Sequence, residues 1–140
     1  MSSYLSIYIV PKRKVEEDVK QHIVVAEYSR STDLYEYFSN VIHPAYIGKE
    51  DKIPYTTITK ANITAILDDF QEDLSKAKAR LVEYEKYASN NPDYIQEIVG
   101  LKEYISDLQY WKDKASFIED MINSSNFYIE GIEEVCCNID

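Results

Sequence analysis

The chain contains few of the residues that interrupt regular structure. Its 140 residues include 3 glycines and 4 prolines, which is typical of a chain made mostly of helices and strands. Three isolated glycines cannot form a glycine-rich phosphate loop, so that class of nucleotide site is excluded. The apolar stretch at residues 4–10 is too short to cross a bilayer and lacks the flanks of a signal peptide. We therefore expect no membrane association.

Side chains that carry chemistry are also scarce. The two cysteines, Cys136 and Cys137, are adjacent, and neighbouring cysteines rarely bridge, which favours a reducing compartment. The two histidines, His22 and His43, have no second ligand at helical spacing, so the sequence predicts no zinc site. Because no nucleophile–base pair or metal motif is recognisable, we expect no enzyme activity and no cofactor, and a cytoplasmic protein (host cytoplasm or virion if phage-encoded).

The charge is strongly negative. The chain has 15 basic and 25 acidic residues, a formal net charge of −10. Such a field repels phosphate backbones, so nucleic acid is not an expected partner. The one basic run, residues 12–14, is cancelled by acidic residues 16–18.

One acidic cluster has a spacing that could serve chemistry. Four carboxylates fall at i, i+1, i+4 and i+5 on one expected helix face: Asp68, Asp69, Glu72 and Asp73. Such a group can bind a divalent cation or act in acid–base catalysis when it lies in a cleft. A solvated face near a helix N-terminus is the better interpretation, and Lys76 pairs favourably with Glu72.

The most informative pattern predicts two long helices, 60–90 and 92–123. Apolar residues step by 4 and 3 in both, which is the spacing of a helix–helix seam. In the first helix they are Ile63, Leu67, Phe70, Leu74, Ala77, Leu81, Tyr84 and Ala88. In the second they are Leu101, Tyr104, Leu108, Trp111, Ala115, Ile118 and Ile122. Because the turn at residues 90–92 is short, the helices must be antiparallel neighbours.

The second helix has apolar residues beyond its seam: Ile98, Ile105 and Phe117. A stripe wider than the seam is expected when one end packs on a sheet or on another subunit. Ile98 and Ile105 fit packing on the sheet at least as well as contact with a partner.

The rest of the chain predicts a small sheet. Strands are expected near 4–10, 22–28 and 127–130, with the second inside the sheet because it is apolar on both faces. A short helix is expected near 33–42, capped by Asp33, Ser31 or Thr32, and 44–58 is a long irregular loop. The fold class is α+β in one domain. The sheet and short helix (1–58 plus a C-terminal strand at 127–135) adjoin the helical hairpin (60–123), and about three mainly antiparallel strands are covered on one face.

These features favour a non-enzymatic protein-interaction or assembly module acting through its hairpin, with a protein partner or self-association. Four tyrosines outside the seam are the candidate contacts: Tyr46, Tyr55, Tyr87 and Tyr110. The alternative is an acidic inhibitor that mimics nucleic acid and occludes a basic site on an enzyme. The abundance of Tyr, Asn, Ile and Lys suggests an AT-rich genome, bacterial or phage.

Overall fold

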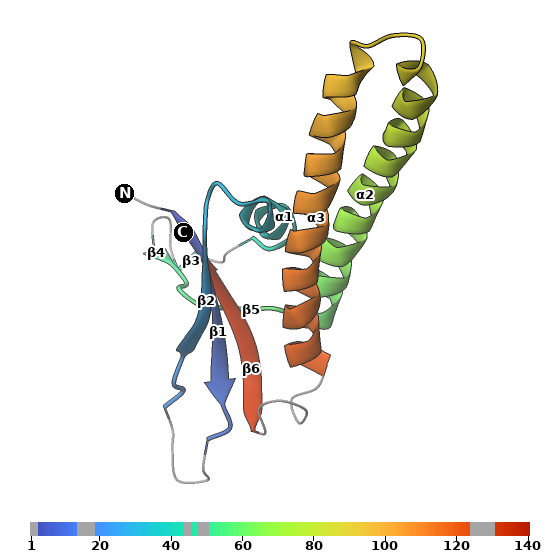
Figure 1. Cartoon of the computed structure of the whole chain (residues 1–140). Coiled ribbons are helices and arrows are strands. Elements are labelled where there is room, and N and C mark those ends of the chain that lie inside the picture. Colours follow the sequence, from blue (N-terminus) through green and yellow to red (C-terminus); the bar gives the residue numbers. More distant parts are fainter. Residues whose placement is uncertain (1–2, 14–18, 44–45, 48–50, 124–130) are drawn as a thin grey trace.

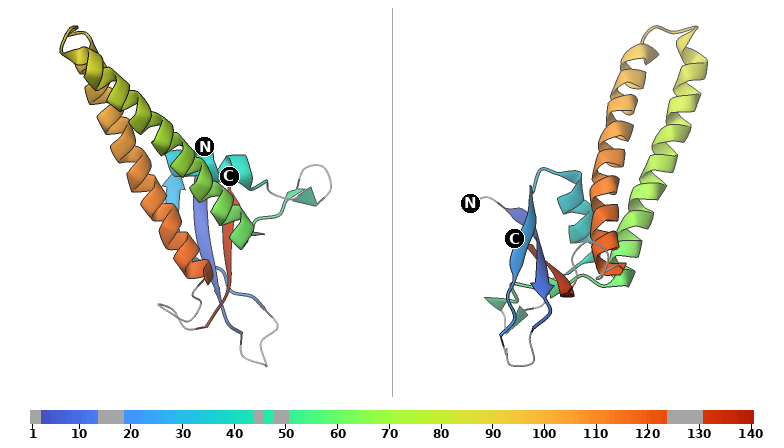
Figure 2. Two further views of the ribbon diagram at one scale, coloured as in Figure 1. Left: turned by 90° about the vertical axis from the view of Figure 1, so that its right-hand side faces the viewer. Right: turned by 60° about the horizontal axis from the view of Figure 1, so that its bottom comes forward.

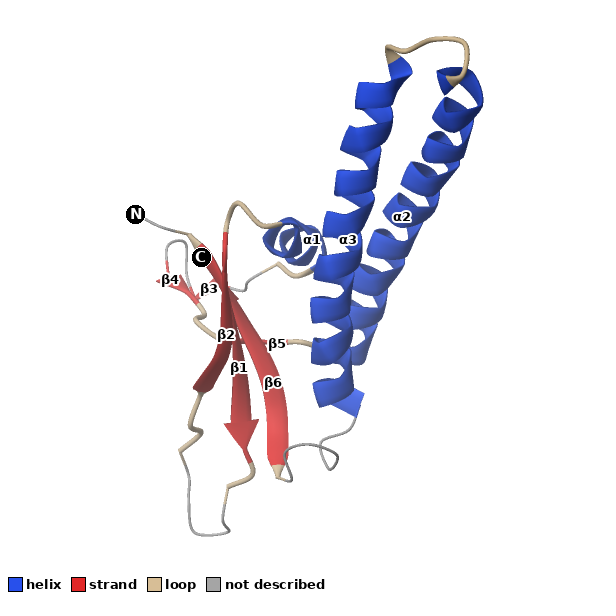
Figure 3. Ribbon diagram, in the orientation of Figure 1, coloured by secondary structure: helices blue, strands red, loops and turns tan. Residues whose placement is uncertain are grey.

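The α+β class is confirmed, with four strands in the main sheet in place of about three. A computed structural model describes residues 3–13, 19–43, 46–47, 51–123 and 131–140. The elements in chain order are β1 (Tyr4–Pro11), β2 (Ile23–Ser29), α1 (Asp33–Val41), β3 (Tyr46–Ile47), β4 (Asp51–Lys52), β5 (Thr56–Thr57), α2 (Lys60–Ala88), α3 (Tyr94–Asn123) and β6 (Ile132–Ile139). Figure 3 shows that the helices and the sheet form two layers.

The main sheet is antiparallel, with the order β2-β1-β6-β5. β1 is central because both of its neighbours pair with it, and its alternate residues Leu5, Ile7 and Ile9 are buried. The short β5, inside the predicted 44–58 loop, adds the fourth strand by pairing Thr56 and Thr57 with β6. The strand expected at 127–130 lies outside the described residues, and β6 overlaps the predicted 127–135 only in part.

The prediction that residues 22–28 form an interior strand is wrong. β2 is at the edge of the sheet, and Ile23, Val24 and Val25 are 45%, 49% and 42% exposed. In a buried strand such an apolar run indicates that both faces of the strand are covered. Here it does not, because these side chains remain exposed. A run of apolar residues on an edge strand also suits contact with another polypeptide.

Local side-chain contacts explain where the helices begin. The Thr32 hydroxyl accepts a hydrogen bond from the Tyr35 backbone N–H at 3.3 Å, so Thr32, not Asp33, caps α1. Thr59 and Asn62 form a reciprocal capping box at α2. The Asn91 side chain accepts from the Asp93 N–H at 3.1 Å just before α3.

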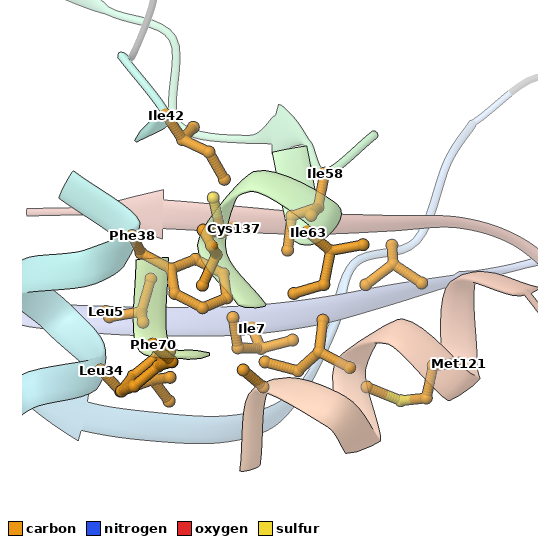
Figure 4. Packing of buried hydrophobic residues seen from close by; sticks show 14 of the residues in the cluster. Leu5, Ile7, Leu34, Phe38, Ile42, Ile58, Ile63, Phe70, Met121 and Cys137 are labelled. Atoms are coloured by element: carbon orange, nitrogen blue, oxygen red, sulfur yellow. The ribbon is translucent and has the colours of Figure 1, made fainter. Parts of the chain in front are cut away.

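The base of the hairpin and α1 cover one face of the sheet, as expected. Figure 4 shows the shared core, in which Ile7 of β1, Phe38 of α1, Phe70 of α2 and Met121 of α3 converge. The other end of the hairpin, around the 89–93 turn, projects beyond the sheet and α1 in Figures 1 and 2. A projecting helical pair and an uncovered edge strand are thus the two unusual features of this fold.

Candidate interaction surface

The outer face of α3 carries a stripe of exposed apolar side chains. Its four members are Ile95 (55% exposed), Val99 (51%), Tyr110 (53%) and Phe117 (54%). Their spacings of 4, 11 and 7 residues place them within about 60° of one another on a helix with 3.6 residues per turn. Leu108 and Ala115, which are buried, fall on the opposite side by the same spacing. α3 is therefore apolar on both faces, although α2 and the sheet cover one of them. We call these four residues the α3 stripe.

The α3 stripe runs into a groove between α3 and the edge strand β2. The groove has a volume of about 500 Å³. It is lined by Ile7, Val25, Ala26 and Tyr28 from the sheet and by Tyr110, Asp113, Lys114, Phe117, Ile118 and Met121 from α3. The pairing of β1 with β2 passes from Ala26 to Val24, so Val25 is the extra residue of a β-bulge. Bulges re-aim a side chain, and the bulged Val25 lines the groove.

Aromatic contacts hold the wall of the groove. Trp111 meets Tyr28 of β2 edge-on, with ring centroids 5.7 Å apart, and Tyr110 meets Trp111 in the same way at 4.8 Å. Burial raises the pKa of the Tyr28 hydroxyl above its ordinary value of 10.0. The groove is consequently a fixed apolar surface, positioned by packing between α3 and β2.

Charged groups occupy only the rim of the groove. The Lys114 ammonium lies 5.1 Å from the centre of the Tyr110 ring, and Gln109 donates to the Asp113 carboxylate at 2.9 Å. An apolar floor with a polar rim of both signs resembles the arrangement of protein–protein interfaces.

The structure separates the four predicted tyrosines. Tyr110 lines the groove, whereas Tyr87 lies at the hairpin end, 6.1 Å from the Tyr94 ring. Tyr55 stacks on His22 at 3.7 Å and meets Tyr8 edge-on. Tyr46 is in β3, which pairs with β4 apart from the main sheet. Tyr55, Tyr87 and Tyr110 therefore lie on different parts of the molecule.

Sequence reasoning missed Ile95, Val99 and Val25 as surface residues and set Phe117 outside the seam without assigning it a contact. The sequence contained this signal for α3, where Ile95, Val99 and Phe117 recur at helical spacing on the side opposite the seam. Ile98 and Ile105 are partly buried, and Ile105 packs on the core. Packing inside the molecule thus accounts for Ile105.

The 68–73 carboxylates do not converge on one point. Glu72 pairs with Lys76 at 2.9 Å, and Asp73 accepts a hydrogen bond from the Tyr37 hydroxyl of α1. Asp68 is exposed. Within the described ranges, no group of three or more His, Cys, Asp or Glu side chains is placed to hold a metal ion.

A small acidic cleft of about 200 Å³ lies between α1 and the hairpin. It is lined by Asp33, Glu36, Tyr37, Asn40, Asp73, Tyr104 and Leu108. Burial, and then the nearby Asp107 and Glu36 carboxylates, raise the pKa of Asp33. The negative field of the chain is therefore locally concentrated in this cleft.

Another group of polar side chains, around Glu134, lies on the sheet face turned away from the helices. Glu134 accepts hydrogen bonds from the Lys20 ammonium at 3.0 Å and from the Thr57 hydroxyl. Burial, together with the Glu134 carboxylate, raises the pKa of the Cys136 thiol to about 12. A thiol with such a pKa is protonated at neutral pH and is a poor nucleophile. Cys136 and Cys137 are both buried.

None of the helices in the described part of the chain combines the length and apolar character needed to cross a bilayer.

Comparisons with known proteins identify no relative, so the surface is interpreted from its own geometry. No protein-family model, curated protein or solved structure matches this chain.

Proposed function

We propose that this chain is a non-enzymatic interaction module that binds a polypeptide through the α3 stripe and the adjoining groove. One observation carries the proposal: four large apolar side chains, each more than half exposed, lie on one side of α3 and lead into an apolar groove. Monomeric proteins rarely leave extended apolar patches in water without a binding role. The bulged Val25 of the edge strand β2, which is 42% exposed, lines the same groove.

The chemistry of the groove supports binding over catalysis. Its polar members, Asp113 and Lys114, sit at the rim, and the remaining lining residues are apolar or aromatic. Aromatic and aliphatic anchors surrounded by polar groups supply most of the binding energy in protein interfaces. The two cysteines are adjacent in sequence, and neighbouring cysteines rarely bridge to each other, which favours a reducing compartment, so we place this binding in the cytoplasm.

A second candidate function draws on the cleft between α1 and the hairpin. The concentration of Asp33, Glu36 and Asp73 around one cleft favours an acidic surface that occupies a basic site on another protein. Such a surface would use a different face from the α3 stripe. Binding that disappears in high salt but survives loss of Phe117 would support this candidate.

Site-specific photo-cross-linking tests the main proposal. A benzophenone amino acid replaces Phe117 in the groove, and a matched variant carries it at Lys78, an exposed position on α2. We expect the cross-linker at position 117 to form a covalent adduct with a polypeptide, either in the cells that make the protein or in the purified protein. We expect the cross-linker at position 78 to form none. Equal or absent adducts at both positions would contradict the proposal.

A further inference from the structure

We infer that the groove receives the hairpin end of a second copy of this chain, with the two α3 helices antiparallel about a two-fold axis. This inference rests on the proposed interaction function. A projecting apolar end and an open apolar groove lie on the same helix. Ile95 and Val99 are at the projecting end of the α3 stripe, and Phe117 and Met121 line the groove at the other end. Antiparallel pairing brings the end of each copy into the groove of the other.

The spacing of the stripe fits this symmetry. Val99 and Phe117 are each nine residues from Leu108, and Ser106 and Tyr110 are each two residues from it. With a rise of 1.5 Å per residue, an axis at the level of Leu108 places Val99 of one copy opposite Phe117 of the other, about 14 Å from the axis. Ser106 then faces Tyr110, and a small side chain opposite a large one lets two helices interlock.

Charges on both flanks of the stripe are complementary in the same arrangement. Lys102 lies six residues before Leu108 and Asp113 five residues after it, within about 20° on one flank. A two-fold axis perpendicular to antiparallel helices keeps each flank on its own side, so Lys102 of one copy meets Asp113 of the other.

The opposite flank repeats the pattern. Glu103 lies five residues before Leu108 and Lys114 six residues after it, so these two also meet across the axis. Among the described residues, none of these four charged side chains forms an ion pair within its own chain. Flanking charges of this kind select partner and orientation in paired helices.

The position of the groove favours an antiparallel pair over a parallel pair of helices. A parallel pair would also oppose charges, bringing Lys102 against Glu103, but it would place one projecting end against the other and leave both grooves open. Strand addition at β2 is disfavoured by the bulge at Val25, because a bulge interrupts the regular edge that another strand needs. An antiparallel pair of helices fills both grooves.

The contact is of modest size. From residue 95 to residue 121 it runs about 40 Å along α3, and a helix about 10 Å wide covers roughly 400 Å² per copy, before the contribution of β2. That area falls below the roughly 800 Å² per partner of standard interfaces. We therefore expect a reversible dimer, populated at tens to hundreds of micromolar.

Sedimentation equilibrium with charge-swapped variants tests the inference. The wild type should approach twice its 16.3 kDa mass as concentration rises. Lys102→Glu places like charges opposite each other at two symmetric positions and should raise the dimer dissociation constant by about tenfold or more. The double variant K102E/D113K restores opposite charges in the antiparallel pair and should recover wild-type association.

The double variant K102E/E103K is the matched control. It restores opposite charges only in a parallel pair, and in the antiparallel one it adds two repulsive contacts to the two that Lys102→Glu creates, so we expect it to associate less than Lys102→Glu alone. Recovery in this control instead would overturn the antiparallel arrangement. Thermal unfolding of each variant establishes that the fold is intact, which the exposure of these side chains predicts.

Two further outcomes separate this inference from the proposed function. Self-pairing through the α3 stripe would be overturned by a wild type that stays monomeric to about 1 mM, or by a dimer whose dissociation constant Lys102→Glu does not change. If position 117 still cross-links to another protein in that case, the interaction function stands and only the identity of the partner is wrong. A monomer without any adduct from position 117 would remove both.

Discussion

The two halves of the helical hairpin share one apolar pattern but differ in burial. At the base, Ile63, Phe70 and Leu74 of α2 face Leu108 and Ile118 of α3, and all are at most 2% exposed. None of residues 78–107, all of which the structure describes, is fully buried. The seam continues in the distal half, with Leu81 and Leu101 partly covered. Two helices alone bury only the seam, and a third layer is needed to exclude water from their sides.

The largest expected effect comes from a charge in the basal seam. Leu74 is 1% exposed, so Leu74→Asp must either bury a carboxylate without a partner or open the core. We expect the free energy of unfolding to fall by at least about 4 kcal/mol, measured by urea denaturation. Leu81→Asp, in the partly covered distal seam, should cost less than half as much. Equal losses at both positions would remove the distinction between the two halves.

A smaller effect should follow from loosening α1 from the base. The Tyr37 ring stacks on Phe70 with centroids 3.7 Å apart, and its hydroxyl donates to the Asp73 carboxylate. Tyr37→Phe keeps the ring and removes the hydrogen bond, so we expect a loss of roughly 1–2 kcal/mol in chemical denaturation.

The same substitution should change the response to alkaline pH. Burial, and then the bond to Asp73, raise the pKa of Tyr37 above its ordinary value of 10.0. The unfolded chain therefore releases this proton first, and the stability that Tyr37 contributes is complete below pH 10 and is lost as the pH rises further. Tyr37→Phe should show a shallower decline above pH 10. An identical decline in both proteins would mean that Tyr37 is not linked to unfolding.

The smallest effect is expected at the projecting end. Tyr94 contacts the rings of Tyr84 at 5.4 Å and Tyr87 at 6.1 Å, outside the buried core. Tyr94→Ala should lower global stability by less than about 1 kcal/mol. In hydrogen exchange monitored by mass spectrometry, it should accelerate exchange of amides near residues 84–101 and leave residues 63–77 unchanged. Acceleration at the base would show that the two halves unfold together.

The fold was predictable where a residue pattern acts over short range. The 4–3 steps from Ile63 to Ala77 and from Leu108 to Ile118 predicted the paired helices, and Thr32 was among the expected caps. Strand order was less predictable, because the apolar run at 23–26 has the composition of an interior strand and lies at an edge. The short β5 has two residues, too few to show a pattern, and it forms by pairing with β6, which lies far away in the sequence.

The candidate surface was predictable in part. Tyr110 was identified from its position outside the seam, and it lies in the groove. Tyr55 was chosen as a tyrosine of the 44–58 loop, and it stacks on His22. Sequence spacing tells which residues share a side of one helix, but it does not tell which side a neighbouring strand will cover.

The amino-acid sequence alone determined that two long helices pair antiparallel, that strands accompany them, and that α3 is apolar beyond its seam. These properties follow from helix periodicity and from a turn too short for any other arrangement. Only the tertiary structure decided that β2 lies at the edge of the sheet, beside α3. That choice depends on packing between segments far apart in the chain, so it alone left Val25, Tyr110 and Phe117 around one open groove.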